Sequence, residues 1–394
     1  MSTRARRLLL VTLPAAMVAA IVMAAFVEVW VRASWEPRKG RPGFFLTDAR
    51  RGQRLAAGYD GWFAGVPVHI NSLELRDPRE YALEKKPNTF RILVLGDSIT
   101  FGHGSVYENT YPYLLEQRLK TWKPDIDWQV WNAAVPGYNT SQELAHLLDV
   151  GDRYQPDLVV VGFFENDLVG NAPAAQPGAA RTAFAHALSF ARRHVYSIEL
   201  YKKVYLTFAW RLSASDAYRR RLEHIDTEDS LLTIADATKL KEQRLSPFDR
   251  LTDQEVRDAR CPDGMKPNPE TVQAMKLEPS FAEWTAAVRE FQRLSAEGRY
   301  RIVFFVNDVP PICPDGDFFY DGGSRDIDDF FLRTLGRGTP VVSSYDAFRR
   351  VRPSQMPNAT AHPIGNSNVV KADVLFEFLR DRVLAGPLPS RSST

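Results

Sequence analysis

The sequence predicts an α/β protein, namely a three-layer α/β/α domain with a parallel sheet, preceded by one N-terminal transmembrane helix. Almost wholly apolar segments at 90–95, 158–164 and 301–306 alternate with amphipathic segments. Strands that are buried on both faces have this composition, and their alternation with helices favours parallel pairing through right-handed crossovers. A further observation is that residues 8–27 form a stretch without charged side chains. Together these features predict a globular domain on an apolar anchor.

The overall composition excludes several classes of protein. The 394 residues are 44% hydrophobic and 25% charged, which is ordinary for a globular chain and excludes collagen-like, coiled-coil, wholly disordered and polytopic membrane proteins. Fifty basic and 48 acidic residues leave a formal charge of +2, and no Lys/Arg run is typical of phosphate tracking. We therefore expect no nucleic-acid partner. Two cysteines are too few for a disulfide-dense scaffold.

The uncharged stretch is long enough to cross a bilayer. Twenty residues at a rise of ~1.5 Å per residue match the ~30 Å hydrocarbon core. We expect residues 8–31 to form a transmembrane anchor, residues 1–7 a cytoplasmic tail, and the remainder to be exported to the periplasmic side. A cleaved signal peptide and a buried core helix are the alternatives. Basic residues flank the stretch on both sides, so charge alone does not fix its orientation.

The anchor is followed by a segment of mixed character and then by the main domain. Residues 32–85 combine Pro, Gly and charge with short apolar patches, which predicts a stalk and a lead-in strand or loop around 66–75. The catalytic domain is expected over 86–386. Residues 387–394 are polar and predict a flexible tail.

The first half of the domain has clear element signals. The strand at 90–95 precedes a helix at 110–122 with Leu114, Leu115 and Leu119 on one face. A weaker strand is expected over 127–135. Thr140 and Glu143 have the spacing of a capping box, and Gly151 is the expected stop of that helix. The second half continues the alternation, with elements expected at 158–164, 280–298 (capped by Ser280 and Glu283), 301–306, 341–342 and 369–384.

An insertion interrupts the alternation. Residues from about 170 to 279 contain no clear strand, so we expect them to be mainly helical. Within them, 192–212 is a run of basic and aromatic residues. Packing against the sheet is the expected role of this run, and lining a substrate groove or lying on a membrane surface are the alternatives.

Ser98 stands where parallel-sheet proteins form their sites. It follows the first strand within the segment 96–104, GDSITFGHG, at a strand-to-loop junction. Its backbone N–H is free there to face a developing negative charge. Neither phosphate-binding glycine motif follows the strand, and Thr100 replaces the last glycine of the G-x-S-x-G elbow. A nucleophilic serine remains the favoured interpretation, with a capped glycine-rich turn as the alternative.

Three further residues are expected at the same sheet edge. Gly137 follows the second strand and Asn166 the third, so their N–H groups and that of Ser98 could bind an oxyanion. His362 precedes the final helix and could accept the Ser98 proton. The other six histidines, including His103, are interpreted as surface or core residues.

These four blocks resemble the SGNH/GDSL hydrolase superfamily. GDSIT at 96–100, Gly137 in NAAVPGY, Asn166 in END and His362 in HPIG match its blocks in order, over roughly 68–170 and 300–384. The resemblance implies a flavodoxin-like fold and serine esterase or acyl-transfer chemistry without a metal or cofactor. It implies Ser98 as nucleophile, His362 as base, and Gly137, Asn166 and the Ser98 N–H as oxyanion hole. The chain is most similar to membrane-anchored members that act on acylated envelope polysaccharides.

One position departs from that family pattern. The family commonly has an aspartate three residues before the histidine, and here that position is Ala359. Three explanations are open. A Ser–His dyad could use a carbonyl or Thr360 to orient the imidazole, an acid such as Asp346 could substitute, or the site could be catalytically weak.

The sequence thus predicts a tethered esterase that acts on O-acyl, first of all O-acetyl, esters of carbohydrate or lipid. An acyltransferase with the same acyl-enzyme and a polysaccharide-binding pseudoenzyme are the alternatives. For an exported domain we also expect Cys261 and Cys313 to pair, since both begin the turn-forming tetrapeptide Cys-Pro-Asp-Gly.

Overall fold

The fold is described from a computed structural model. The residues described are 8–35, 40–171, 177–212, 245–261, 270–277, 279–314, 316–321, 324–356, 358–359 and 362–386. The predicted cytoplasmic tail 1–7, the polar tail 387–394 and Thr360 lie outside these residues.

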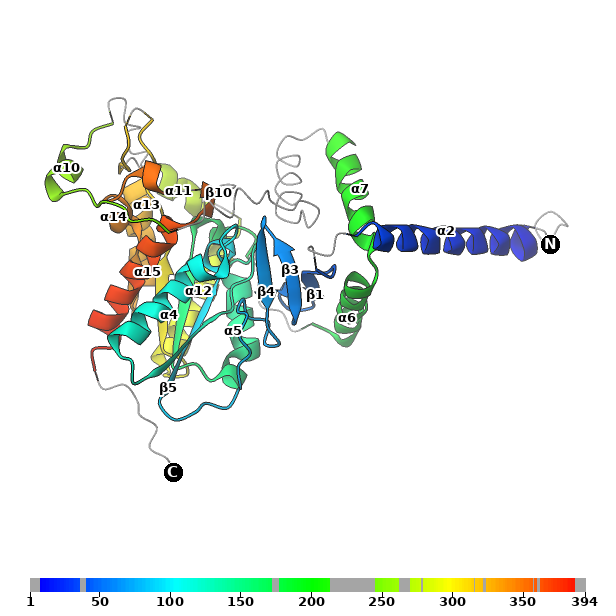
Figure 1. The fold of residues 1–394 in the computed structure, drawn as a ribbon, viewed down its shortest axis with the longest axis horizontal. Helices are drawn as coiled ribbons and strands as arrows, with labels where there is room; N and C mark the ends of the chain where they lie inside the picture. The colour runs from blue at the N-terminus through cyan, green and yellow to red at the C-terminus, as the bar shows by residue number, and fades with distance from the viewer. Residues whose placement is uncertain are drawn as a thin grey trace.

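A five-stranded parallel sheet forms the centre of the domain (Figure 1). Its strand order is β6-β5-β7-β8-β9, and every neighbouring pair is parallel. The strands are β5 (Thr89–Gly96), β6 (Asp127–Asn132), β7 (Leu158–Phe163), β8 (Ile302–Val306) and β9 (Val341–Ser343). The predicted parallel sheet is confirmed. All carboxyl ends of these strands meet at one edge, where ligands bind in such sheets.

Helices cover both faces of the sheet, which confirms the three layers. Leu93 and Leu95 pack in the cluster that contains α5 (Thr140–Tyr154), α12 (Phe281–Ala296) and α13 (Ser324–Leu335). Ile92 and Val94 belong to the opposite cluster, with α4 (Tyr111–Trp122) and α15 (Asn366–Phe378). Because side chains alternate along a strand, the continuous apolar run of β5 supplies both cores.

The start and end of α5 differ from the sequence prediction. Its N-cap is Asn139, and the capping box is Asn139 with Gln142 rather than Thr140 with Glu143. Asparagine is the better N-cap, and Glu143 is fully buried, so it does not turn back to the backbone. Gly151 lies inside the helix, where a Cβ would be 2.5 Å from the Tyr300 hydroxyl. The helix ends at Tyr154, with Gln155 in the left-handed conformation.

Smaller differences concern other element boundaries. β6 stops at Asn132, so residues 133–135 belong to the loop that leads into the site. Ser280 precedes α12, but its hydroxyl donates to the Leu168 carbonyl at 2.5 Å and does not cap that helix. The final helix begins at Asn366 and continues as η6 (Leu379–Val383). Short helices, all at or near the carboxyl edge, are α3 (Ser98–Phe101), η3 (Tyr107–Asn109), η4 (Glu165–Leu168), α14 (Tyr345–Phe348) and η5 (Pro353–Gln355).

The predicted stalk is wrong for residues 44–63, whereas the lead-in strand expected around 66–75 is confirmed at 66–70. Residues 44–70 form two antiparallel hairpins from β1 (Phe45–Asp48), β2 (Gly52–Leu55), β3 (Tyr59–Phe63) and β4 (Val66–Ile70). Phe44, Leu55 and Ile70 are fully buried there, in a cluster that also includes Phe101 and Tyr138 of the main domain. The apolar patches of this segment are scattered in sequence because two-residue alternation buries only one face of each strand.

The insertion is helical where the structure describes it, but its aromatic run does not pack on the sheet. Its helices are α6 (Ala179–His194), α7 (Ser197–Leu212), α10 (Asp253–Asp258) and α11 (Glu270–Lys276). The Ser189 hydroxyl of α6 donates to the Thr47 carbonyl in β1. α7 starts beside the domain end of the N-terminal helix and runs at a steep angle to that helix (Figure 1). Both sheet faces are already covered by other helices, so the expected packing of 192–212 against the sheet is wrong.

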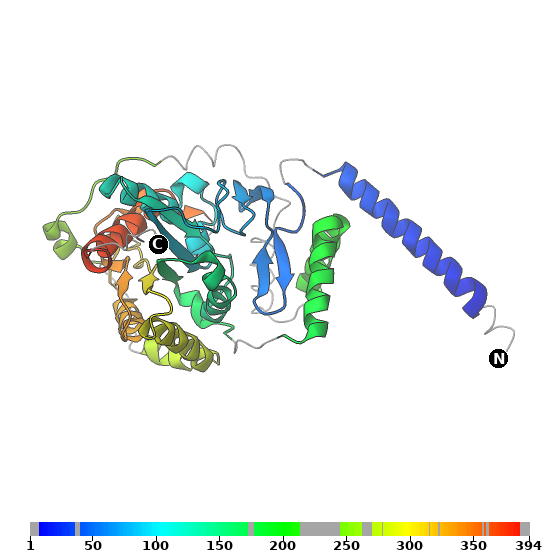
Figure 2. The same cartoon turned by 90° about the horizontal axis from the view of Figure 1, so that it is seen from below.

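One helix is long and apolar enough to cross a membrane. The stretch Leu10–Ala33 has a mean hydropathy of 2.4, and its most apolar window is not buried by the rest of the chain. It comprises the end of η1 (Leu8–Thr12) and α2 (Leu13–Ala33). Figure 2 shows that α2 projects away from the domain, with the green helices between it and the hairpins. Length and composition are the properties that identify this helix.

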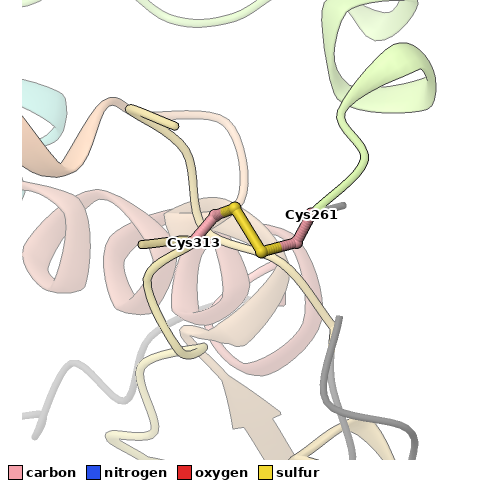
Figure 3. Close-up of a disulfide and its surroundings, with 2 residues drawn as sticks. All are labelled: Cys261 and Cys313. Atoms are coloured by element: carbon pink, nitrogen blue, oxygen red, sulfur yellow. A yellow bond between two sulfur atoms is a disulfide. The ribbon is translucent and has the colours of Figure 1, made fainter. Parts of the chain in front are cut away.

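A disulfide ties the insertion to the main domain. Cys261 and Cys313 are bonded, with Cα atoms 5.6 Å apart and a separation of 52 positions in sequence (Figure 3). Cys313 is buried in the segment after β8, and Cys261 follows α10. The predicted pairing is confirmed. The bond fixes the part of the insertion that lies beside the carboxyl edge of the sheet.

We predict that Cys261→Ser lowers the free energy of unfolding. Loop closure over this separation is worth up to about 4 kcal/mol, and Cys261 is only half-buried, so little packing is lost with it. Denaturant unfolding of the variant, and of the wild type with and without reductant, measures the difference. Reduced wild type should match the variant. Two alkylatable thiols in protein prepared without reductant would contradict the pairing.

Candidate active site

Ser98 is held at the first turn of a short helix after β5. Asp97 caps α3, and its carboxylate accepts the Ile99 N–H at 2.9 Å. Ser98 is the first residue of α3, so the helix leaves its backbone N–H unused. The side chain is 4% exposed. The structure thus gives Ser98 the predicted position, at the sheet edge with an N–H available to a ligand.

The glycine before this turn is required by close packing. A Cβ at Gly96 would be 2.2 Å from Thr100 Oγ1, and the same atom is equally close to a Cβ at Gly162 in β7. The Tyr111 hydroxyl donates to Thr100 Oγ1 at 3.0 Å. Gly96 and Thr100 of the GDSIT block therefore allow the turn that carries Ser98 to pack closely against the sheet. This packing sets the position of Ser98.

His362 reaches Ser98 from the other end of the domain. Its Nε2 lies 2.8 Å from Ser98 Oγ, across 264 positions of sequence. His362 belongs to β11 (His362–Pro363), which pairs with β10 (Asn358–Ala359) just before α15. A serine hydroxyl and an imidazole nitrogen at this distance are within reach for proton transfer. The structure brings together the two residues expected to be nucleophile and base.

His103 also lies at this site, whereas the sequence interpretation treated it as a surface or core residue. Its ring stacks on that of His362, with centroids 4.3 Å apart and planes at 22°. Phe63 of β3 contacts the His103 ring edge-on at 5.3 Å, and the His103 N–H donates to the Ser98 carbonyl at 2.9 Å. The His103 ring therefore forms one wall of the site and limits the orientations that the His362 imidazole can adopt. Its place five residues after Ser98, in the same glycine-rich loop, is the signal that could have identified it.

Asn166 is anchored by the buried carboxylate of Asp97. Its Nδ2 donates to Asp97 Oδ2 at 3.0 Å, and the residue is exposed on η4. Burial raises the pKa of the Asp97 carboxyl, and the hydrogen bonds from Asn166 and Ile99 oppose that rise. Because Asp97 holds one N–H of the amide group, the second N–H is left to face outward. This arrangement suits an oxyanion donor.

Gly137 lies in the loop after β6, with a φ of +79° that favours glycine. β2 holds this loop from the other side. Gln53 Nε2 donates to the Pro136 carbonyl at 2.9 Å, and the Tyr138 hydroxyl donates to the Gln53 carbonyl at 2.6 Å. Gly137 itself is exposed. All four predicted site residues thus lie at the same edge of the sheet, and their catalytic roles remain predictions.

Two positions bear on the acid that is missing beside His362. Asp346 is the candidate substitute, and Ala359 is the position where the family commonly has the aspartate. Asp346, on α14, has a 72% exposed side chain and is ion-paired with Arg325, which lowers its pKa. That pairing disfavours Asp346 as the partner of His362. Ala359 is directly opposite His362 in the β10–β11 hairpin. Directly opposed residues share a face, so an acid at 359 would stand beside the imidazole.

A buried arginine from the lead-in segment supports the nucleophile loop, and no sequence pattern identified it in advance. Arg76 is 1% exposed and donates to the carbonyls of Phe101, Gly102 and Ser105. Burial lowers the pKa of Arg76 to about 9. Its guanidinium donates to three carbonyls of one loop, two of which also accept from other groups: Phe101 from the Asn132 amide and Gly102 from the Ser105 N–H. The lead-in thus helps to shape the loop that carries Ser98 and His103.

A cavity of about 230 Å³ opens beside Ser98. Its wall includes the neighbours of the site residues, Ile99, Pro363 and Glu165, and it contains both carboxyl and hydroxyl groups. The lining residues are Ile99, Phe164, Glu165, Asn307, Asp308, Val309, Ser324, Ile327, Tyr345 and Pro363. Burial and the carboxylates of Asp328 and Glu165 raise the pKa of Asp308. In the described part of the chain, no three His, Cys, Asp or Glu side chains are grouped as metal ligands.

Comparison with known proteins agrees with this geometry. The GDSL-like lipase/acylhydrolase family model matches residues 94–326, which include Ser98, Gly137 and Asn166 but not His362. An arylesterase of Vibrio mimicus is 35% identical over 77 residues. That match covers 20% of this chain and 38% of the relative, so the chain spans well under half of that protein's length.

Solved structures with similar folds have low sequence identity. One is LAE5, an alpha/beta hydrolase enzyme from the metagenome of Lake Arreo, at 13% identity and a TM-score of 0.37, covering 73% of this chain and 94% of that one. Another is the acetylxylan esterase Axe2 of Geobacillus stearothermophilus, at 13% identity and a TM-score of 0.35. That match covers 74% of this chain and 93% of the other. These scores are too low to carry an argument about this chain.

We predict that Asn166→Ala lowers kcat for ester hydrolysis by roughly 10²–10³, the usual effect of one lost oxyanion donor. Asn166→Asp, which keeps the shape but replaces the donor with a carboxylate beside Asp97, should lose at least as much. Steady-state kinetics with p-nitrophenyl acetate measures both. Rates equal to the wild type in correctly folded variants would place Asn166 outside the site.

We also predict that Ala359→Asp raises kcat, by roughly tenfold or more, because loss of the orienting acid has cost ~10⁴ in a serine protease. A carboxylate beside His362 stabilises the imidazolium and raises the pKa of His362. Since the neutral imidazole is the base, the acid limb of the pH–rate profile should move to higher pH. The matched variant Asp346→Asn should change neither quantity. A strong loss in Asp346→Asn with no effect of Ala359→Asp would identify Asp346 as the acid.

Proposed function

The chain belongs to the GDSL-like lipase/acylhydrolase family, and from that premise we propose that it is an exported, membrane-tethered serine esterase. It removes O-acyl groups, first of all O-acetyl groups, from envelope or extracellular polysaccharide. The observation that carries this proposal is the 2.8 Å contact between Ser98 Oγ and His362 Nε2 at the open edge of the sheet.

The mechanism follows from that contact. His362 Nε2 takes the Ser98 proton while Oγ attacks the ester carbonyl carbon, and the carbonyl oxygen becomes an oxyanion. The N–H groups of Ser98, Gly137 and the Asn166 amide stabilise that charge. The imidazolium then gives its proton to the departing sugar oxygen, which leaves the acyl group on Ser98. Water, deprotonated by the same imidazole, attacks the acyl-enzyme and releases the acid and free Ser98.

The cavity beside Ser98 supports a short acyl group on a hydroxyl-rich alcohol. Its volume of about 230 Å³ is modest, and Glu165, Asp308 and Tyr345 place polar atoms in its wall. A long acyl chain would bury those polar atoms without hydrogen-bond partners, which is costly. Sugar hydroxyls would pair with them. This lining favours acylated carbohydrate over lipid as substrate.

Two observations support the proposed location. Leu10–Ala33 is long and apolar enough to span a bilayer. The Cys261–Cys313 disulfide belongs to an oxidising compartment, since the cytosol keeps thiols reduced. A chain that α2 anchors in the membrane, with its main domain on the periplasmic side, accounts for both the apolar helix and the disulfide.

We predict that Ser98→Ala reduces hydrolysis of acetylated xylan and of p-nitrophenyl acetate to the background rate without loss of fold. Wild-type activity should be much higher on p-nitrophenyl acetate than on p-nitrophenyl palmitate. Ser295→Ala is the matched control, because Ser295 lies in the last turn of α12, just before β8 begins and thus at the opposite sheet edge. Retained acetate release in Ser98→Ala would end the proposal, and a preference for palmitate would overturn the short-acyl assignment.

A further inference from the structure

α7 carries bulky apolar side chains on one exposed face. They recur at three- and four-residue spacing, so they line a single stripe of the helix. Their exposed fractions run from 44% to 81%, far above those of core residues. The residues are Tyr201, Val204, Tyr205, Phe208 and Leu212. We call them the α7 stripe. Soluble surfaces rarely expose so continuous an apolar patch without a partner.

The first turn of α7 is fixed to the far end of the apolar helix α2. The Glu28 carboxylate accepts the N–H groups of Tyr196 at 3.0 Å and Ser197 at 2.8 Å, where α7 begins. A carboxylate at this place satisfies the unused N–H groups of a helix start. Figure 1 shows α7 leaving α2 at this junction. If α2 crosses a membrane, the start of α7 therefore lies at the same depth in that membrane as Glu28.

Arg32 and Trp35 strengthen the same junction. Arg32 Nε donates to Glu28 at 2.6 Å, and its NH2 group donates to the His194 carbonyl at 2.5 Å. The guanidinium lies 4.5 Å from the Tyr196 ring centroid, and Trp35 contacts that ring edge-on at 5.0 Å. Glu28 and Arg32 are thus paired charges near the end of the apolar helix. Such pairs are tolerated at the border of a bilayer but costly at its centre.

The position of Glu28 sets where α7 would lie in a membrane. Glu28 is five residues before Ala33, the last residue of α2. At ~1.5 Å per residue, the junction is about 8 Å inside the end of the helix. Amphipathic helices bind the interface with their apolar face buried ≈ 5–10 Å at the boundary of headgroups and acyl chains. Tyr and Trp are the residues enriched at that boundary.

We propose that α7 is an interfacial helix, with the α7 stripe inserted into the same lipid leaflet from which α2 emerges. The proposal rests on the proposed anchoring of α2 and adds a second attachment to the membrane. Lys202 and Arg211 of α7 supply positive charge for anionic headgroups. A lipid surface fits better than a protein partner because the start of α7 is hydrogen-bonded to Glu28, about 8 Å inside the end of the apolar helix α2.

The second attachment would fix the orientation of the catalytic domain. α6 ends at the same junction and binds the hairpins, through Ser189 to the Thr47 carbonyl at 2.8 Å and Arg193 to the Ala57 carbonyl at 3.0 Å. β2 in turn holds the loop of Gly137 through Gln53. A helix anchored at one point lets a domain turn about the membrane normal and tilt, whereas α2 and α7 together restrict the tilt. The site then keeps a set height above the lipid.

Photolabelling from the lipid phase tests this inference. The full chain is reconstituted in vesicles of phosphatidylcholine and phosphatidylglycerol that contain a small apolar diazirine, and adducts are mapped by peptide mass spectrometry. We expect adducts in α2 and in 197–212. In Tyr205→Glu/Phe208→Glu, labelling of 197–212 should fall several-fold while α2 labelling and ester turnover stay unchanged. Leu277→Glu, at a 78% exposed leucine outside the stripe, is the matched control and should change neither.

The other outcomes overturn the inference in distinguishable ways. Labelling of α2 without 197–212 would leave the anchor and remove the interfacial helix. Crosslinks between the α7 helices of two copies, with no lipid adducts there, would make the stripe an interface between copies. Absence of adducts in α2 would refute the proposed tether itself, and with it the second attachment, while leaving the esterase chemistry untouched.

Discussion

The hydrogen bond between Ser98 Oγ and His362 Nε2 is the constraint on which the proposed chemistry depends. It spans 2.8 Å in space and 264 positions in sequence, so it exists only if the whole sheet is assembled. Parallel order brings the end of β5 and the start of α15 to one edge. Thr100, packed against the glycines of β5 and β7, sets the height of the nucleophile turn. The tertiary fold, and no local motif, makes the pair.

The segment between the apolar helix α2 and the first strand of the sheet is part of this site. Arg76 holds the carbonyls of the loop after Ser98, Phe63 contacts His103, and Gln53 holds the loop of Gly137. His103 in turn stacks on His362. Because these supports come from the hairpins and from the segment that follows β4, the geometry of the site is tied to residues that precede the sheet. Anchoring and catalysis are then mechanically connected through one small β unit.

The sequence predicted the sheet well because its strands are buried on both faces, which produces apolar runs such as that of β5. It also placed Ser98, Gly137, Asn166 and His362 at a common edge. It missed the hairpins, whose one-sided burial leaves only scattered apolar residues. It could not place His103 on His362, since stacking is a tertiary contact. Asn139 with Gln142 and Thr140 with Glu143 both have the spacing of a capping box. Only the burial of Glu143, which is a tertiary property, decides between the two pairs.

The most direct test of the account is the reaction of the full chain with a fluorophosphonate, which forms a stable adduct with an activated serine. The account predicts one adduct, at Ser98, whose rate of formation falls at acid pH, where a protonated imidazole no longer accepts the Ser98 proton. His362→Ala should slow that reaction and remove the acid limb of its pH profile. An adduct at another residue, or a rate at Ser98 that is indifferent to His362, would contradict the account.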